Sequence, residues 1–314
     1  MRYAAGADPA HDRPAYVRAA SGLVWVRDRL AVIQDDASFI ALVDPATGSA
    51  EAFALPAAAE GTRQFDDSRG NKAHKLDLEA ITTVPSRDGL MLAAFGSGSL
   101  APREVVVLVS FGDGPPVDVA VHRASRFYSL LRRAAEFAGS DMNIEGALLA
   151  RGTLTLFGRG NGAAAGEVEP VNASCQVGWT ELVAHLEHPE TAAPPPPAAI
   201  VQYDLGMLEG IPLGFTDVTS GRGDWVFYSA AAEASPDATR DGQVHGSVLG
   251  MLGSRDEEGR WGRLRDENGG PLVAKVEGVT LDRERADRAY AVVDTDDHTQ
   301  PSELLELRLS GPWW

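Results

Sequence analysis

Three glutamates and two hydroxyl residues recur at one position of a long repeat, and together they could bind a cation. The position lies in short phrases such as Leu-Glu-Ala-Ile and Val-Glu-Gly-Val, each of which begins a run with β-strand character. Its occupants are Ser21, Glu79, Glu145, Thr216 and Glu277, at intervals of 58, 66, 71 and 61 residues. An all-oxygen ligand set without cysteine or histidine is the set that Ca²⁺ prefers. The sequence therefore predicts one calcium ion, held by these five side chains in a central channel.

A ring of hydrogen bonds is the alternative to a bound ion. Three glutamates that converge on one axis repel one another strongly, and a divalent cation relieves that repulsion. Backbone amides or water molecules across the channel would relieve it as well. Mg²⁺ fits the pattern less well, because a wide five-fold channel cannot easily impose a tight octahedron.

The length of the repeat indicates which elements position these residues. Each repeat can be divided into about four short strands separated by turn residues, which is typical of the blades of a β-propeller. The innermost strand of every blade then borders a common channel. The sequence predicts an all-β chain that forms a single five-bladed β-propeller domain over residues 1–314. Four-stranded blades are expected at about 21–56, 77–122, 143–205, 214–266 and 275–309.

The last repeat is one strand short. A strand-like stretch at 15–19 precedes the first repeat, and we expect it to complete the last blade, which closes the ring and removes an exposed sheet edge. The segment 125–138 has the apolar spacing of a helix, and we place a short helix there, in the loop between blades two and three. In the third repeat we expect a strand at 179–186.

Composition limits the class of protein and its partners. Hydrophobic residues make up 44% of the chain, enough for a substantial core, and no apolar stretch approaches the ~20 residues of a membrane-spanning helix. The first residues lack the apolar segment of a signal peptide, so we expect a cytoplasmic location. A formal net charge of −17 repels nucleic acids and anionic membranes, and we expect neither as a partner. Cys175, the only cysteine, excludes an internal disulfide and is expected to be buried and inert.

Polar loops are expected on the face of the propeller where the ring residues lie. Strands alternate in direction within a blade, so the loops after the second strands open on that face. They carry Asp35, Arg159 and Asp296, among other polar residues. We take Asp35 and Asp296 as candidate catalytic residues that orient water, and His74, in a neighbouring loop, as a candidate general base.

Basic residues cluster in the loops that precede Glu79 and Glu145. Arg69 and Lys72 lie in the first of these loops, and Arg132 lies in the second. With Arg159 they are candidate substrate-binding residues, because bases around a cation suit a small anionic molecule such as a phosphate or a carboxylate. Ion pairing with nearby acids is the alternative interpretation.

Common catalytic motifs are absent from the sequence. It contains no Gly-x-Ser-x-Gly elbow, no phosphate-binding glycine-rich loop and no His-Glu-x-x-His pair. Asp217 and Glu145 could form the carboxylate pair of a glycosidase, but nothing in the sequence sets the separation that such a pair requires.

The glutamate phrases resemble those of a known group of propellers. Asp77-Leu78-Glu79-Ala80-Ile81 and Val276-Glu277-Gly278-Val279 are similar to motifs of phytase-like (esterase-like) β-propeller proteins. The order Ser, Glu, Glu, Thr, Glu also resembles the Ser-Glu-Glu-Ser-Glu cage of five-bladed calcium-activated nucleotidases, with Thr216 the one departure. The resemblance implies a propeller with a central Ca²⁺. It covers about five short motifs and identifies no nucleotide-binding residue.

Two functions are consistent with these features. The first is a calcium-dependent hydrolase of a small anionic ester, in the phosphate ester or lactone class. The alternative is a non-catalytic propeller that binds a ligand or a protein around a structural Ca²⁺. The sequence does not decide whether the chain is an enzyme. A cation that is open to solvent would favour the first function, and a cation sealed by five side chains the second.

Overall fold

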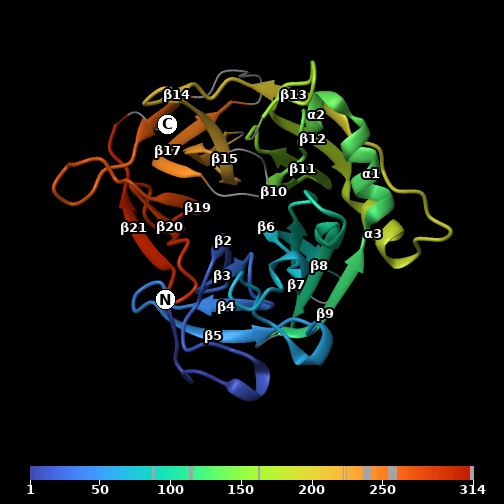
Figure 1. The fold of residues 1–314 in the computed structure, drawn as a ribbon, viewed down its shortest axis with the longest axis horizontal. Helices are drawn as coiled ribbons and strands as arrows, with labels where there is room; N and C mark the ends of the chain where they lie inside the picture. Colours follow the sequence, from blue (N-terminus) through green and yellow to red (C-terminus); the bar gives the residue numbers. More distant parts are fainter. Residues whose placement is uncertain are drawn as a thin grey trace.

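Five small β-sheets surround a central channel in the computed structural model, as Figure 1 shows. The structure describes residues 1–86, 89–112, 116–161, 163–221, 223, 225–235, 242–253 and 260–311. The innermost strands β2, β6, β10, β15 and β19 follow one another around the channel, and each contacts the next. The predicted five-bladed β-propeller is therefore confirmed.

Each blade is built from strands that follow one another in the sequence. Blade one contains β1 (Arg2–Tyr3), β2 (Ala20–Val26), β3 (Arg29–Gln34), β4 (Phe39–Val43) and β5 (Ser49–Ala54). Blade two contains β6 (Leu78–Ser86), β7 (Gly89–Gly96), β8 (Val105–Phe111) and β9 (Pro116–Arg123). Blade three contains β10 (Ile144–Ala150), β11 (Thr153–Gly158), β12 (Asn172–Gly178) and β13 (Ala198–Tyr203).

The last two blades differ from each other in size. Blade four contains β14 (Met207–Leu208), β15 (Ile211–Ser220), β16 (Val226–Ala234), β17 (Gln243–Leu252) and β18 (Arg260–Arg263). Blade five contains β19 (Lys275–Leu281), β20 (Arg288–Asp294) and β21 (Glu303–Arg308). The three α-helices of the described residues are α1 (Ser125–Arg133), α2 (Ala135–Ala138) and α3 (Trp179–Glu187). None of them has the length and apolar character that a membrane-spanning helix requires.

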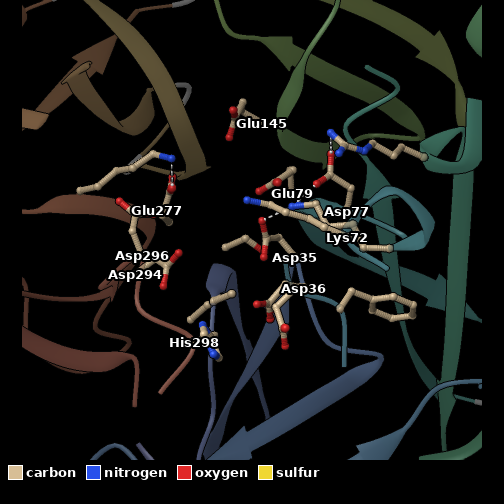
Figure 2. A pocket seen from close by; sticks show the side chains of 18 of the residues that line it. Asp35, Asp36, Lys72, Asp77, Glu79, Glu145, Glu277, Asp294, Asp296 and His298 are labelled. Atoms are coloured by element: carbon tan, nitrogen blue, oxygen red, sulfur yellow. Dashed lines mark hydrogen bonds and ion pairs between the residues drawn. The ribbon is translucent and has the colours of Figure 1, made fainter. Parts of the chain in front are cut away.

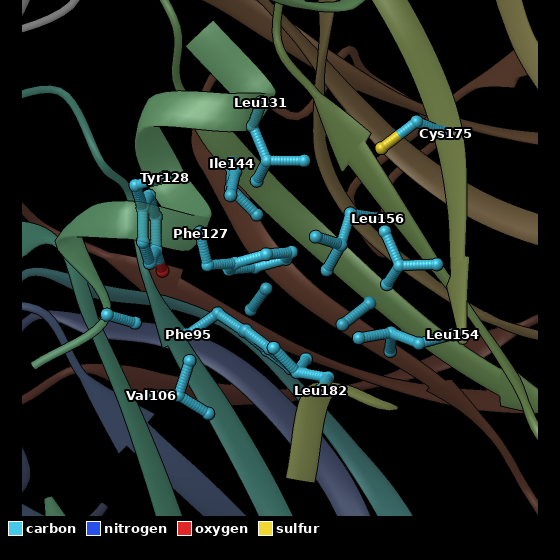
Figure 3. Close-up of a cluster of buried hydrophobic side chains, with 14 of the residues drawn as sticks. Phe95, Val106, Phe127, Tyr128, Leu131, Ile144, Leu154, Leu156, Cys175 and Leu182 are labelled. Atoms are coloured by element: carbon cyan, nitrogen blue, oxygen red, sulfur yellow. The ribbon is translucent and has the colours of Figure 1, made fainter. Parts of the chain in front are cut away.

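Apolar side chains pack between neighbouring blades. Five clusters fill the five interfaces, and the largest joins blades two and three beneath the helices (Figure 3). Phe127 and Leu131 of α1 and Leu182 of α3 are fully buried in it. Cys175 lies in the same cluster, and burial raises the pKa of its thiol to about 12, which agrees with the prediction of an inert cysteine.

The segment 179–186 is a helix, so the prediction of a strand there was wrong. The third strand of blade three is β12, which ends at Gly178. Trp179, Leu182 and Leu186 are buried at helical spacing, and this face of α3 packs on the blade. Helical periodicity was therefore present in the sequence and was misread as a strand. The predicted helix over 125–138 is confirmed, as α1 and α2.

The predicted closure by residues 15–19 was also wrong. The N-terminal strand β1 pairs in parallel with β5 of blade one, and blade five has three strands among the described residues. The N-terminal segment meets blade five at Ser302, whose backbone N–H donates to the carbonyl of Val17 at 2.8 Å. The next residues bind blade one, where the buried Arg18 side chain pairs with Asp36 and the Ala19 carbonyl accepts the backbone N–H of Asp35 at 2.9 Å.

A β-bulge interrupts each innermost strand at the same place. The pairing skips one residue per blade, and the skipped residues are Ser21, Glu79, Glu145, Thr216 and Glu277. A bulged residue leaves the hydrogen-bond ladder, and the local kink re-aims its side chain. The five repeat residues thus occupy one structural position around the channel, as the spacing predicted.

A glycine beside the last bulge allows the innermost strands to approach closely. A Cβ atom at Gly278 would lie 2.8 Å from Leu23 Cδ2 and 2.9 Å from the Cα atom of Gly22. We expect Gly278→Ala to lower the free energy of unfolding by about 1–3 kcal/mol, because backbone cannot yield as a side chain does. Gly158→Ala is the matched control, since a Cβ there would make ordinary contacts at 3.6 Å. Equal midpoints for the two variants in urea unfolding would contradict this expectation.

Candidate functional site

A strongly acidic cavity of about 180 Å³ lies at one mouth of the channel, and residues from all five blades line it (Figure 2). We call it the acidic cavity. Twelve carboxylate residues line it: Asp35, Asp36, Asp66, Asp67, Asp77, Glu79, Glu145, Glu233, Glu277, Asp294, Asp296 and Asp297. Its five lysine or arginine residues are Lys72, Lys75, Arg103, Arg159 and Lys275. The predicted gathering of the polar loops on the ring face is confirmed by this lining.

Four of the five predicted metal ligands line the acidic cavity: Ser21, Glu79, Glu145 and Glu277. The two hydroxyl residues join blades. Ser21 Oγ donates to the carbonyl of Leu78, and Thr216 Oγ1 donates to the carbonyl of Val276. Each carbonyl belongs to the residue that precedes a ring glutamate on the next blade. The hydroxyls therefore fix the strands that carry Glu79 and Glu277.

Two of the three ring glutamates have partners on their own strand or just before it. Asn143 donates from Nδ2 to Glu145 Oε1 at 2.7 Å, and Lys275 Nζ lies 2.6 Å from Glu277 Oε1. Each partner lies two residues before its glutamate. Arg159 adds a contact of 3.4 Å to Glu145 and pairs with Glu233 at 2.8 Å.

Glu79 has no such partner. The residue two places before it is another acid, Asp77, and Glu79 forms no hydrogen bond or ion pair with any residue that the structure describes. Oxygen atoms of Asp35, Asp77 and Glu79 all lie within 4.8 Å of one another, and we call these residues the carboxylate triad. Lys75 Nζ lies between two of them, 2.5 Å from Asp35 Oδ2 and 2.6 Å from Asp77 Oδ1. Glu79 is thus held among negative charges.

The pKa values of the buried acids reflect this crowding. Burial, together with the carboxylates of Asp77, Glu145 and Asp35, holds the pKa of Glu79 well above its usual range. Burial raises the pKa of Glu145 to about 8 in spite of Arg159, and Glu277 adds to the effect. The pKa of Asp294 is also well above its usual range, through burial and then through Asp35 and Asp296. Ionisation of Glu79, Glu145 and Asp294 is therefore unfavourable in the cavity.

Bases lower the pKa of other acids in the same cavity. Burial opposes ionisation of Glu233, but Lys275 and Arg159 outweigh it and bring the pKa of Glu233 to about 2. Burial likewise opposes ionisation of Asp77, but the charges of Lys75 and Arg103 outweigh burial and lower the pKa of Asp77. Arg103 lies 2.9 Å from Asp77. Negative charge is therefore concentrated where bases are present and suppressed at Glu79.

These residues fit a hard divalent cation. The inner wall holds seven carboxylates (Asp35, Asp77, Glu79, Glu145, Glu233, Glu277 and Asp294) against Lys75, Arg103, Arg159 and Lys275, an excess of three acids. Asp35 Oδ1 and Glu277 Oε2 are buried without a hydrogen-bond partner. Carboxylate oxygens are the ligands that Ca²⁺ prefers, and an ion would supply the missing partner for such atoms.

The other predicted site residues divide into two groups. Asp35, Asp296, Lys72 and Arg159 line the acidic cavity. His74 is exposed, and His74, Arg69 and Arg132 are outside the lining. Arg69 pairs with Asp12 at 3.0 Å, and Arg132 pairs with Glu104 at 2.8 Å. The ion-pair interpretation of these two arginines therefore matches the structure.

Asp217 lies outside the lining of the acidic cavity. Its carboxylate accepts the backbone N–H groups of Val218 at 2.7 Å and Val279 at 2.8 Å, so it joins blade four to blade five. The contacts give Asp217 a structural role and provide no support for a glycosidase pair with Glu145.

The sequence interpretation missed the residues that pair with the ring. Lys275 and Asn143 neutralise or bind ring glutamates, and Asp77 repels one. A signal was available at the repeat position two residues before the ring. Its occupants are Ala19, Asp77, Asn143, Gly214 and Lys275. Asp77 is the only acid among them, so blade two is the one blade in which an acid takes this position beside the ring glutamate.

A family model matches residues 16–309, most of the chain, and its description is a family of unknown function (DUF6929). The chain belongs to this family. No curated protein matches the chain significantly in sequence.

The solved structures that resemble this chain in shape share little sequence identity with it. A GH43 β-1,3-galactosidase, BT0265, matches with a TM-score of 0.47 and 10% identity, over 96% of this chain and 58% of its own. The chain therefore spans little more than half of that enzyme. The PQQ domain of pyranose dehydrogenase from Coprinopsis cinerea matches with a TM-score of 0.43 and 10% identity, over 98% of this chain and 100% of its own. An α-L-arabinanase from Penicillium chrysogenum matches with a TM-score of 0.41 and 10% identity, over 93% of this chain and 97% of its own.

The raised pKa of the cavity acids predicts how stability depends on pH. Between the unfolded pKa of a glutamate, near 4.5, and the folded pKa of Glu145, about 8, the folded state binds more protons than the unfolded state. Stability must therefore fall as pH rises through this window. In the presence of a chelator, we expect the melting temperature to fall by several degrees between pH 5 and pH 8.5.

Glu145→Gln removes the titrating carboxyl group of Glu145, so the melting temperature of this variant should fall less than that of wild type as pH rises from 5 to 8.5. Asn143 can still donate to the glutamine oxygen, so the variant preserves that contact. Melting curves at matched ionic strength measure the effect, with Glu306→Gln on the exposed strand β21 as the control. If wild-type protein becomes more stable between pH 5 and pH 8.5, the interpretation that burial and crowding raise the pKa of these acids is refuted.

Proposed function

We propose that this propeller binds Ca²⁺ in the acidic cavity and uses the ion to hydrolyse a small ester. The observation that carries the proposal is the carboxylate triad, in which Glu79 has no partner among the described residues and lies close to Asp35 and Asp77. An unneutralised carboxylate in a crowded acidic cavity is costly, and a divalent cation removes that cost. Asp35, Asp77 and Glu79 would hold the ion, with Glu145 and Glu277 completing the charge balance.

The cavity is open to solvent at the channel mouth, which supports a catalytic role over a sealed structural site. Ca²⁺ in this place would polarise an ester oxygen and stabilise the negative charge that forms on it. Asp296 lines the cavity and can accept a proton from water. The phosphate ester and lactone classes remain the substrates to test.

A non-catalytic propeller is the second candidate, and one observation favours it. Of the bases in the cavity, Lys75, Arg103, Arg159 and Lys275 all pair with carboxylates. These bases are committed to the protein itself, so an anionic substrate would depend on the ion for its binding. In that case Ca²⁺ would stabilise the five blades, and the cavity would bind a neutral ligand or a protein loop.

Calcium binding is tested first. Titration calorimetry on metal-free protein should give one bound Ca²⁺ per chain, and saturation at about 100 times Kd should add roughly 2.7 kcal/mol to the free energy of unfolding. Glu79→Gln should weaken Ca²⁺ binding by about tenfold or more. Even the loss of a residue that only hydrogen-bonds a metal ligand lowers metal affinity by about 10- to 100-fold. Asp67→Asn, at an aspartate that lines the same cavity but is 86% exposed, is the matched control and should change Kd little. Wild-type protein that releases no heat and melts identically with Ca²⁺ and with chelator would refute the site.

Catalysis is tested separately, with a panel of phosphate monoesters, phosphoanhydrides and lactones. We expect calcium-dependent turnover of at least one compound, lost on addition of chelator and reduced by about 100-fold or more in Glu79→Gln. Asp67→Asn should retain the activity. A protein that binds Ca²⁺ but hydrolyses none of these compounds would favour the non-catalytic candidate.

A further inference from the structure

We infer that the ammonium group of Lys75 is a built-in occupant of the cation site, and that a divalent ion binds by displacing it. The inference rests on the proposed function in one respect, since the same carboxylate triad holds the ion. It adds a regulatory element, because the affinity for the ion is then set by a residue of the chain that competes with it.

The position of Lys75 is that of a bound cation. Its Nζ atom bridges Asp35 Oδ2 and Asp77 Oδ1 at 2.5 and 2.6 Å, and the oxygens of both acids lie within 4.8 Å of an oxygen of Glu79. Only 5% of Lys75 is exposed. An ammonium group with two carboxylate oxygens this close fills the space that a metal bound by the same oxygens would need.

The ammonium group does not satisfy the site fully. Lys75 brings one positive charge to three carboxylates, and Arg103 contacts only Asp77 among them. Asp35 Oδ1 is still buried without a partner, and so is Oε2 of Glu277, a residue that is 6% exposed and lines the same cavity (Figure 2). A divalent ion carries twice the charge and accepts six to eight oxygens, so it can bind atoms that the lysine leaves unused.

Lys75 belongs to a loop and not to the ring strand. Lys75 directly follows the short 3₁₀ turn Lys72–His74, in the loop before β6, and it precedes the strand that carries Glu79. The carboxylates at the mouth of the cavity are those of Asp36, Asp66 and Asp67, which pair with Arg18 and Lys72. A displaced ammonium group would meet these acids, and the ring strand would stay in place.

Removal of the competing charge tests the inference. Titration calorimetry with CaCl₂ should show that Lys75→Met binds Ca²⁺ about tenfold more tightly than wild type or better. Lys72→Met is the matched control, because Lys72 lines the same cavity, is 37% exposed and lies outside the triad. Its Kd should stay within about threefold of wild type. A folded Lys75→Met protein that binds Ca²⁺ no better than wild type would overturn the inference.

The two proposals fail in different ways. If Lys75→Met binds Ca²⁺ and wild type does not, Lys75 blocks the site, and both its displacement by Ca²⁺ and calcium binding by the native chain are refuted. If Lys75→Met and wild type bind Ca²⁺ equally well, calcium binding stands and the inference alone is refuted. If neither protein binds, both are refuted.

A second measurement uses wild-type protein, in case Lys75→Met does not fold. Brief acetylation of lysines, read by peptide mass spectrometry, should modify Lys75 little in chelator and several-fold more at saturating Ca²⁺. Lys72 should be modified equally in both conditions. Unchanged modification of Lys75 at saturating Ca²⁺ would overturn the inference.

Discussion

Unequal pairing of buried acids is the constraint on which the organisation of this propeller depends. Five bulges aim one residue per blade at the channel, and three of those residues are glutamates. Glu145 and Glu277 receive partners from residues two places earlier, whereas Glu79 meets the carboxylate of Asp77. Carboxylates this close cannot all ionise without a positive charge between them. The ring glutamate that lacks a basic or amide partner therefore lies off the five-fold axis, beside the acids of blades one and two.

This asymmetry changes the picture of a symmetric ion cage. A ring of five equal ligands would place an ion on the axis, sealed by its side chains. In the structure the two hydroxyls bind carbonyls of the next blade, and two glutamates have basic or amide partners. The ring glutamate without a hydrogen-bond or ion-pair partner among the described residues is Glu79, and it lies close to Asp35 and Asp77. A site at the side of an open cavity leaves room for a ligand, which an axial cage would not.

Much of the fold was predictable, because its signals are periodic. The bulged position repeats at similar intervals, and it lies near the start of four of the five innermost strands, so spacing led to five blades and to the ring. The strand at 179–186 failed for a local reason, since Trp179, Leu182 and Leu186 follow helical spacing in α3. The closure at 15–19 failed because several contacts hold that segment on blade one, among them the Arg18–Asp36 ion pair and the hydrogen bond from the Asp35 backbone N–H to the Ala19 carbonyl. Such individual contacts leave no periodic trace in a sequence.

The site was less predictable than the ring, for a similar reason. Residue types identified Glu79 and the other ring residues as candidate ligands and Asp35 as a candidate catalytic residue, but the pairing of acids with bases depends on which side chains meet across the channel. Arg159, taken as a substrate-binding residue, lies between Glu145 and Glu233. Lys75 was one of several loop bases in the sequence, and only the fold places its ammonium group between Asp35 and Asp77. The repeat position that contains Asp77 was the one signal that could have revealed the asymmetry.

Anomalous diffraction from crystals grown with CaCl₂ tests the central claim most directly. We predict one calcium peak off the channel axis, with oxygens of Asp35, Asp77 and Glu79 about 2.3–2.6 Å away. A cavity with no peak at saturating Ca²⁺, or a peak on the axis that is coordinated equally by all five blades, would contradict the account.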